Sequence, residues 1–127
     1  MWVPDGWAPN ATLAGRSILV IEDEPVIALE INATLSAAGA SIASATNTRD
    51  ALRMLSLPDV SAAVVDITLG DEDCSAVCNH LSERGIPFVF YTAQARPDLM
   101  RRWPNAPVLT KLASTDRLVE TVAGVLR

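Results

Sequence analysis

The sequence predicts an α/β fold in which helices cover both faces of a parallel sheet. Five short apolar runs alternate along the chain with segments whose apolar residues recur at helical spacing. Within the runs the apolar residues are consecutive, which is typical of strands that are buried on both faces. The chain has 127 residues, of which 50% are hydrophobic, so it has the size of one domain and enough apolar side chains for a core.

Turn and capping residues delimit the helices. Pro25 suits the first turn of a helix that Gly39 can end, and Thr46 or Asn47 can cap the next helix. Ser114 can cap the last helix, whereas the segment ITLGDED after the third strand is expected to be a loop. The expected strands are residues 17–22, 41–45, 62–65, 86–91 and 107–110, and the expected helices are residues 25–38, 48–57, 74–84, 96–103 and 115–126.

Composition and charge argue against several classes of protein. A net charge of −5 and a pI of about 4.7, without a run of Lys and Arg, speak against a nucleic-acid-binding surface. No apolar run approaches the ~18 residues of a membrane span, and the first residues lack the basic and apolar regions of a signal peptide. We therefore expect a cytoplasmic protein in which Cys74 and Cys78 are reduced and residues 1–15 form a flexible arm.

Polar side chains follow four of the expected strands, at the point where each strand ends. Glu22 and Asp23 follow the first strand, and Asp66 follows the third. Thr92 ends the fourth strand and Lys111 follows the fifth. Ligands of open α/β sheets bind beyond the carboxyl ends of the strands, so we expect these side chains to converge on one rim if the strand order brings them together.

The chemistry of these groups indicates a magnesium and phosphoryl site. Three carboxylates in one place repel each other, and one of them is driven toward protonation unless a cation binds. Mg²⁺ prefers oxygen ligands, and no nitrogen or sulfur ligand accompanies the acids. The Asp66 carboxylate can accept a phosphoryl group as an acyl phosphate, with Lys111 and Thr92 to hold its oxygens. The alternative is structural, because an acid after a strand is often a helix cap, and Asp23 or Glu24 could cap the helix at Pro25.

The motifs ILVIEDE, AAVVDITLGDE, PFVFYTA and VLTK, in this order and spacing, resemble the response-regulator receiver domain of two-component signalling. The resemblance covers residues 16–127, and RGIPFVFYTA with RRWPNAPVLTK is similar to single-domain or kinase-linked receivers of alphaproteobacteria. It implies a flavodoxin-like (βα)5 three-layer sandwich with a five-stranded parallel sheet of order 2-1-3-4-5.

The resemblance also implies a signalling switch rather than an enzyme. Its phosphoryl group would come from a sensor histidine kinase, and its output would be a contact with an unidentified downstream protein or the draining of phosphoryl groups from the kinase. The sequence leaves open whether the chain forms a homodimer. The implied roles are phosphoacceptor for Asp66, Mg²⁺ ligands for Glu22, Asp23, Asp66 and the backbone carbonyl of Thr68, switch hydroxyl for Thr92, and phosphoryl-binding amine for Lys111.

Two positions depart from the receiver pattern. Leu112 follows the lysine where receivers usually have proline, and Val108 stands where many carry an aromatic switch residue. These departures motivate an alternative, in which the chain is a degenerate receiver that binds proteins without being phosphorylated. A phosphatase with an aspartyl nucleophile is a further alternative, but it needs a general acid and usually a lid domain, for which this chain is short.

Overall fold

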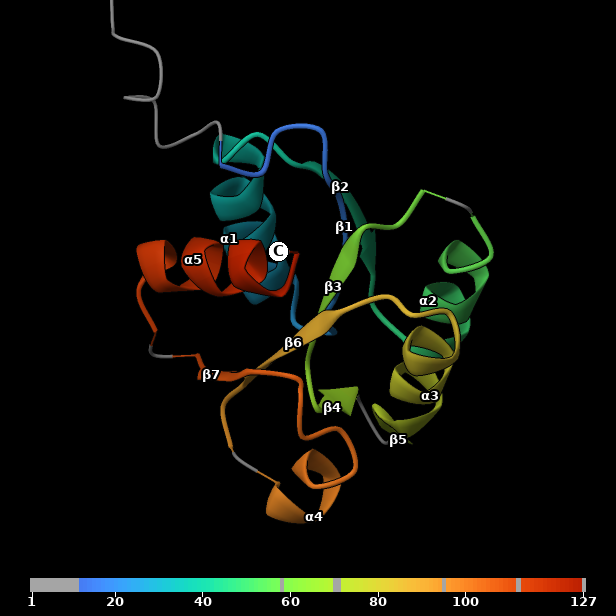
Figure 1. Cartoon of the computed structure of the whole chain (residues 1–127). Helices are drawn as coiled ribbons and strands as arrows, with labels where there is room; N and C mark the ends of the chain where they lie inside the picture. The colour runs from blue at the N-terminus through green and yellow to red at the C-terminus, as the bar shows by residue number, and fades with distance from the viewer. Residues whose placement is uncertain (1–11, 58, 70–71, 95, 112, 127) are drawn as a thin grey trace, which may run out of the picture.

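The computed structural model describes residues 12–57, 59–69, 72–94, 96–111 and 113–126, and a parallel five-stranded sheet forms its centre (Figure 1). Its strands are β1 (Ser17–Ile21), β2 (Ser41–Ala45), β3 (Ala62–Val65), β6 (Phe88–Thr92) and β7 (Val108–Thr110). The strands lie in the order β2-β1-β3-β6-β7. Counted along the chain within this sheet, that order is 2-1-3-4-5, so the predicted topology is confirmed.

Helices cover both faces of the sheet and make a three-layer sandwich. In Figure 1, α1 and α5 lie on one side of the strands, and α2 and α3 lie on the other. The short helix α4 follows β6 near the bottom of Figure 1, and its Leu99 joins the core that lies under α2 and α3. The helices are α1 (Pro25–Ala37), α2 (Thr48–Met54), α3 (Ser75–Glu83), α4 (Pro97–Met100) and α5 (Thr115–Val125).

The consecutive apolar residues of the strands are divided between two cores. In β1, Leu19 and Ile21 belong to the buried cluster under α2 and α3, whereas Ile18 and Val20 belong to the cluster under α1 and α5. Successive side chains of a strand point to opposite faces, so an unbroken apolar run serves both layers at once. All four side chains are at most 1% exposed.

Two of the predicted helix caps are present. The side-chain oxygen of Asn47 accepts a hydrogen bond from the backbone N–H of Asp50 at 2.8 Å, and the Ser114 hydroxyl accepts one from the Arg117 N–H at 3.2 Å. At α1 the cap position is Glu24, but its side chain makes no capping hydrogen bond. Capping therefore does not explain the Glu24 carboxylate.

The largest local difference from the sequence prediction is a small hairpin where a loop was expected. The strands β4 (Thr68–Leu69) and β5 (Glu72–Asp73) pair antiparallel, with Leu69 opposite Glu72. Leu69 is only 4% exposed and joins the core under α3, so an apolar side chain inside the polar segment anchors β4. Helix α4 spans four residues instead of the expected 96–103, and β6 starts after Pro87, which has no N–H to donate.

Part of the predicted arm and one predicted departure lie outside the described residues. These are residues 1–11 and Leu112. The last residues of the arm pack on the domain, because Leu13 is fully buried and its N–H donates to the Ala38 carbonyl at 2.7 Å. Cys74 and Cys78 are free thiols and are both fully buried.

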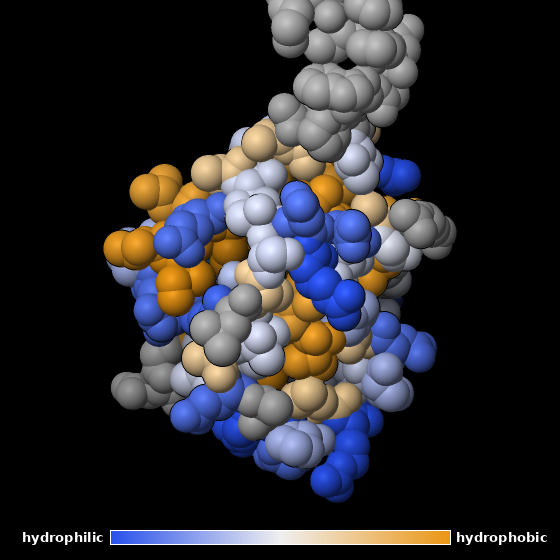
Figure 2. Space-filling model, turned by 90° about the vertical axis from the view of Figure 1, so that its left-hand side faces the viewer, coloured by the Kyte–Doolittle hydropathy of each residue, from blue (hydrophilic) through white to orange (hydrophobic). Residues whose placement is uncertain are grey.

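Helix α1 presents apolar side chains to solvent beside the carboxyl end of β1. Val26 is 70% exposed and Leu29 is 68% exposed. Figure 2 shows the face of the molecule with α1 and α5, where hydrophobic side chains interrupt a polar surface. Among the described residues, no helix has both the length and the apolar character needed to cross a bilayer.

We expect the variant Asn47→Ala to lower the free energy of unfolding by about 1 kcal/mol, because the N–H of Asp50 loses its capping partner. Urea unfolding followed by circular dichroism measures the change. Ser36→Ala, an exposed substitution near the end of α1, is the control and should leave the unfolding midpoint nearly unchanged. An equal loss in both variants would contradict the capping role.

Candidate functional site

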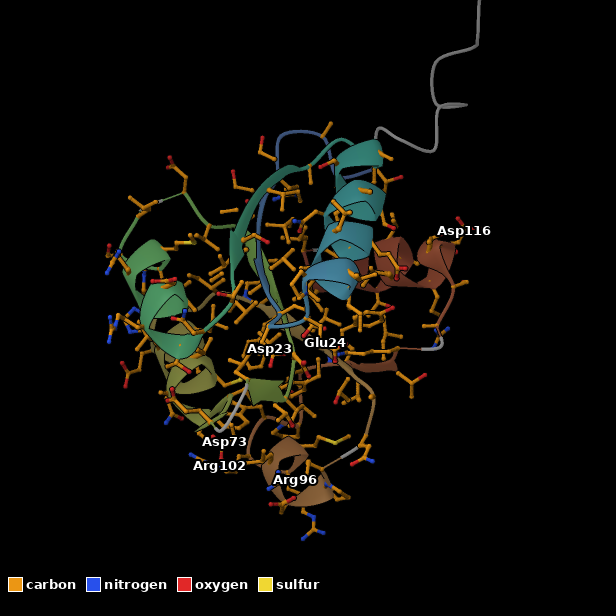
Figure 3. All side chains as sticks on the ribbon, turned by 180° about the vertical axis from the view of Figure 1, so that it is seen from behind. Asp23, Glu24, Asp73, Arg96, Arg102 and Asp116 are labelled. Carbon is orange, nitrogen blue, oxygen red and sulfur yellow. The ribbon has the colours of Figure 1, made fainter. Side chains whose placement is uncertain are left out.

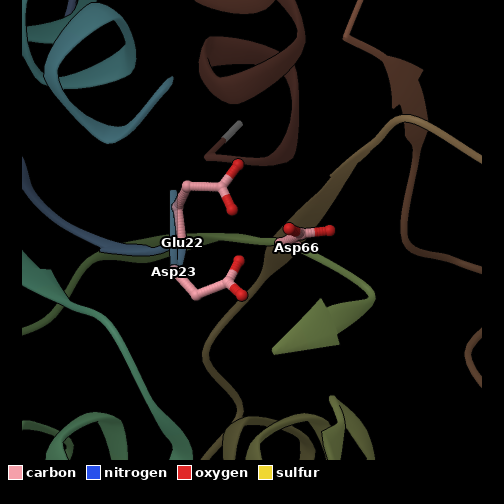
Figure 4. Close-up of side chains that lie close together, drawn as sticks. All are labelled: Glu22, Asp23 and Asp66. Carbon is pink, nitrogen blue, oxygen red and sulfur yellow. The ribbon is translucent and has the colours of Figure 1, made fainter. Parts of the chain in front are cut away.

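The strand order brings the predicted polar residues to one edge of the sheet. Glu22 and Asp23 follow the end of β1, and Asp66 follows the end of β3, the strand beside it. Figure 4 shows the carboxylates of Glu22 and Asp23 turned toward Asp66. One oxygen from each of the three carboxylates lies within 4.8 Å of the others. These three acids therefore form the cluster that the sequence predicted.

A small pocket of about 180 Å³ opens over this edge. Its lining includes every predicted site residue except Glu22, and adds Glu24, Ala93 and Gln94. The lining residues are Asp23, Glu24, Asp66, Thr68, Thr92, Ala93, Gln94 and Lys111. Glu22, Asp66 and Thr92 are buried, with exposures of 1%, 6% and 3%.

The ammonium of Lys111 lies among the carboxylates. Its Nζ is 2.7 Å from Glu22 Oε1 and donates a hydrogen bond to Asp66 Oδ2 at 3.2 Å. Glu24 Oε1 is 3.6 Å from the same nitrogen. The backbone N–H of Lys111 donates to the Thr92 carbonyl at 2.9 Å, so the pairing of β6 and β7 fixes where this side chain starts. One cation therefore faces several acids.

Burial and the neighbouring charges shift the ionisation of the site. Burial raises the pKa of Glu22 to about 8, and the neighbouring Asp66 carboxylate adds to the rise against the opposing effect of Lys111. The pKa of Lys111 is also raised: burial acts to lower it, but the close contact with the Glu22 carboxylate and the attraction of Asp66 outweigh burial. The lysine stays charged while the buried glutamate holds a proton near neutral pH.

The residues fit a hard divalent cation. Glu22, Asp23 and Asp66 supply carboxylate oxygens, which Mg²⁺ prefers, and no thiol or imidazole accompanies them in the described part of the pocket. Glu22 Oε1 is buried and makes no hydrogen bond of good geometry within the described chain, although Lys111 Nζ is close. A buried carboxylate oxygen without a well-oriented hydrogen bond is suited to bind a metal ion.

Hydrogen bonds within the loops hold Asp66 and Thr92. Asp66 Oδ1 accepts a hydrogen bond from the Thr68 N–H at 3.3 Å, which places the backbone of Thr68 beside the carboxylate. The Thr92 hydroxyl donates to the Gln94 carbonyl at 3.0 Å and accepts from the Gln94 N–H at 3.3 Å. Thr92 is therefore engaged by the loop that follows it, a contact that the sequence did not predict.

Sequence reasoning assigned Glu24 to a helix cap and missed its place at the site. The third acid of the run Glu22–Glu24 was the available signal, because a residue so close to the strand end has to lie near the same rim.

Comparison with known proteins identifies the family. A family model described as the response regulator receiver domain matches residues 18–123. The chain belongs to this family. A search of curated proteins finds no match in sequence.

Solved receiver structures share the fold of this receiver domain. A response regulator receiver protein from Sinorhizobium medicae WSM419 is 24% identical, with a TM-score of 0.80 over 87% of this chain and 94% of that chain. A CheY-like response regulator receiver domain protein from Methanospirillum hungatei JF-1 is 20% identical, with a TM-score of 0.80 over 87% of this chain and 93% of that chain. Receiver domains are signalling switches that bind Mg²⁺ in an acidic pocket and interact with histidine kinases and output partners.

We expect Mg²⁺ to bind this receiver domain more tightly as the pH rises toward about 8, the pKa of Glu22, and to level off above it. A carboxylic acid with a raised pKa keeps its proton below that pKa, and the ion has to displace the proton. The apparent affinity should rise by up to about tenfold per pH unit for one displaced proton. Calorimetric Mg²⁺ titrations between pH 6 and 9 measure the affinities (roughly the range in which such a group titrates).

The variant Glu22→Gln is the control for this measurement. It should bind Mg²⁺ more weakly and with a shallower pH dependence, because the titrating group is gone. An equally steep profile in the variant would show that another group releases the proton.

Proposed function

We propose that the chain is a phosphoaspartate switch in which Asp66 accepts a phosphoryl group from a sensor histidine kinase in the presence of Mg²⁺. The observation that carries the proposal is the contact of Lys111 Nζ with both Asp66 and Glu22. These two carboxylates form the acidic cluster together with Asp23. This arrangement offers a nucleophile, a set of metal ligands and a cation within one small pocket.

In the proposed reaction, an Asp66 carboxylate oxygen attacks the phosphorus of a phosphohistidine. The bond between that oxygen and phosphorus forms as the bond from phosphorus to the histidine nitrogen breaks, and the electron pair stays with the imidazole. Glu22, Asp23, Asp66 and the Thr68 backbone carbonyl would hold Mg²⁺, which when bound neutralises charge on the phosphoryl oxygens.

The remaining pocket residues would hold the phosphoryl group and report its presence. The Lys111 ammonium is already 3.2 Å from Asp66 Oδ2 and has only to exchange one anionic partner for another. The Thr92 hydroxyl first has to leave the Gln94 carbonyl. We infer that this release repacks the surface around residues 93–113, which contains α4 and β7, and so changes which proteins the domain binds. Output by protein contact or by draining phosphoryl groups from the kinase is consistent with this change.

A related structure supports the chemistry. A response regulator protein from Burkholderia pseudomallei has been crystallised with a phosphorylated aspartic acid, a calcium ion and citrate. It is 20% identical to this chain, with a TM-score of 0.74 over 84% of this chain and 66% of that chain. A divalent cation and a phosphoaspartate occur together in that protein, as we propose for Asp66 here.

The alternative of a degenerate, phosphorylation-independent binding module is not favoured. Of its two motivating residues, Leu112 lies outside the described residues, and Val108 is half-buried against the core and does not line the pocket. Mg²⁺ titration separates the two functions, because a binding module has no need for the ion.

Incubation with Mg²⁺ and acetyl phosphate should add the mass of one phosphoryl group to the wild-type chain and none to Asp66→Ala. The reason is that Asp66 lines the pocket, contacts Lys111 and belongs to the acidic cluster with Glu22 and Asp23. Intact-mass spectrometry measures the addition. Asp59→Asn removes an exposed carboxylate away from the pocket and should be labelled like the wild type. Labelling of Asp66→Ala, or of none of the proteins, would overturn the proposal.

A further inference from the structure

Glu24 is a charged residue at the mouth of the pocket that neither a helix cap nor the metal site accounts for. Its side chain is 61% exposed, and its Oε1 lies 3.6 Å from Lys111 Nζ. It occupies the cap position of α1 without making a capping hydrogen bond. Figure 3 shows Glu24 next to Asp23, where β1 gives way to α1. The carboxylate therefore lies between solvent and the lysine that faces the proposed phosphoryl acceptor.

The charges around this mouth are predominantly negative. Asp23, Glu24 and Asp66 line the pocket with the buried Glu22 close by, and Lys111 is the only cation in the described lining. Arg96, two residues after the lining residue Gln94, does not line the pocket and forms an exposed ion pair with Asp98 at 3.0 Å. Glu24 adds one more negative charge on the open side, where an incoming phosphoryl donor has to pass.

We propose that Glu24 is a specificity-determining residue that disfavours small, highly charged phosphoryl donors. Repulsion between a fixed carboxylate and a donor grows with the charge of the donor, and it is weakly screened at the distances within a small pocket. A phosphohistidine presented by a docked protein offsets the repulsion with its interface, whereas a free acyl phosphate has no such compensation. Glu24 thus favours a protein donor over small donors of high negative charge. The inference rests on the proposed function of Asp66.

Two small phosphoryl donors of different charge separate an electrostatic effect of Glu24 from a structural effect of replacing it. In acetyl phosphate the phosphorus–oxygen bond breaks and acetate leaves with the electron pair, as Asp66 gains the phosphoryl group. In phosphoramidate the phosphorus–nitrogen bond breaks and ammonia leaves. Phosphoramidate carries less negative charge near neutral pH because its nitrogen is protonated. The Glu24 carboxylate should therefore slow its reaction less than that of acetyl phosphate.

The experiment compares the wild type with Glu24→Gln, with each donor, at saturating Mg²⁺ and low ionic strength. Initial phosphorylation rates are measured by intact mass, and dephosphorylation is followed separately. We expect Glu24→Gln to speed reaction with acetyl phosphate, and to raise the ratio of the acetyl phosphate rate to the phosphoramidate rate by about threefold, the size of one charge acting across a solvated pocket. The change in this ratio should shrink as salt is added.

Two variants serve as controls. Glu30→Gln removes the same charge from an exposed position on α1 outside the pocket and should leave the ratio unchanged. Glu24→Asp keeps the charge and should preserve the wild-type ratio. An unchanged ratio in Glu24→Gln, or an equal change in Glu30→Gln, would overturn the inference. If neither donor labels the wild-type chain, the proposed function fails instead, so the two failures are distinguishable.

Discussion

The repulsion between carboxylates at the end of the sheet is the constraint on which the site depends. Glu22, Asp23 and Asp66 have oxygens within 4.8 Å of one another, and two of these side chains are buried. A buried like-charged cluster is costly unless protons or cations compensate it. Lys111 supplies one positive charge, while burial and the neighbouring Asp66 raise the pKa of Glu22. A divalent cation bound among these carboxylates would relieve their repulsion.

The rest of the fold serves to hold that cluster together. β1 and β3 are neighbours at the middle of the sheet, and their apolar residues pack into both cores, so the loops that carry the acids start from rigid ends. β6 and β7 add Thr92 and Lys111 from the same edge. The site draws on four strands that are distant in sequence, and tight packing between the layers keeps their ends in register.

The sequence predicted the structure correctly where a local residue pattern has one physical explanation. Consecutive apolar runs predicted the strands, Asn47 and Ser114 predicted caps, and the acids after β1 and β3 predicted a cluster that the structure contains. It was uninformative where tertiary contacts decide. The β4–β5 hairpin depends on the burial of Leu69. The position of the Glu24 carboxylate at the pocket depends on its contact with Lys111, which lies 87 residues later in the chain (111 − 24). Neither contact has a local signature.

The hydrogen bonds of Thr92 have a consequence for how sequence variation acts on this domain. Both partners of the hydroxyl are backbone atoms of Gln94, its carbonyl and its N–H. Replacing the glutamine side chain leaves those atoms in place for any residue except proline, which has no N–H, so the tether of the hydroxyl does not depend directly on the side chain at position 94. A substitution at position 94 can therefore change the side chain that lines the pocket while the backbone hydrogen bonds to the Thr92 hydroxyl are kept.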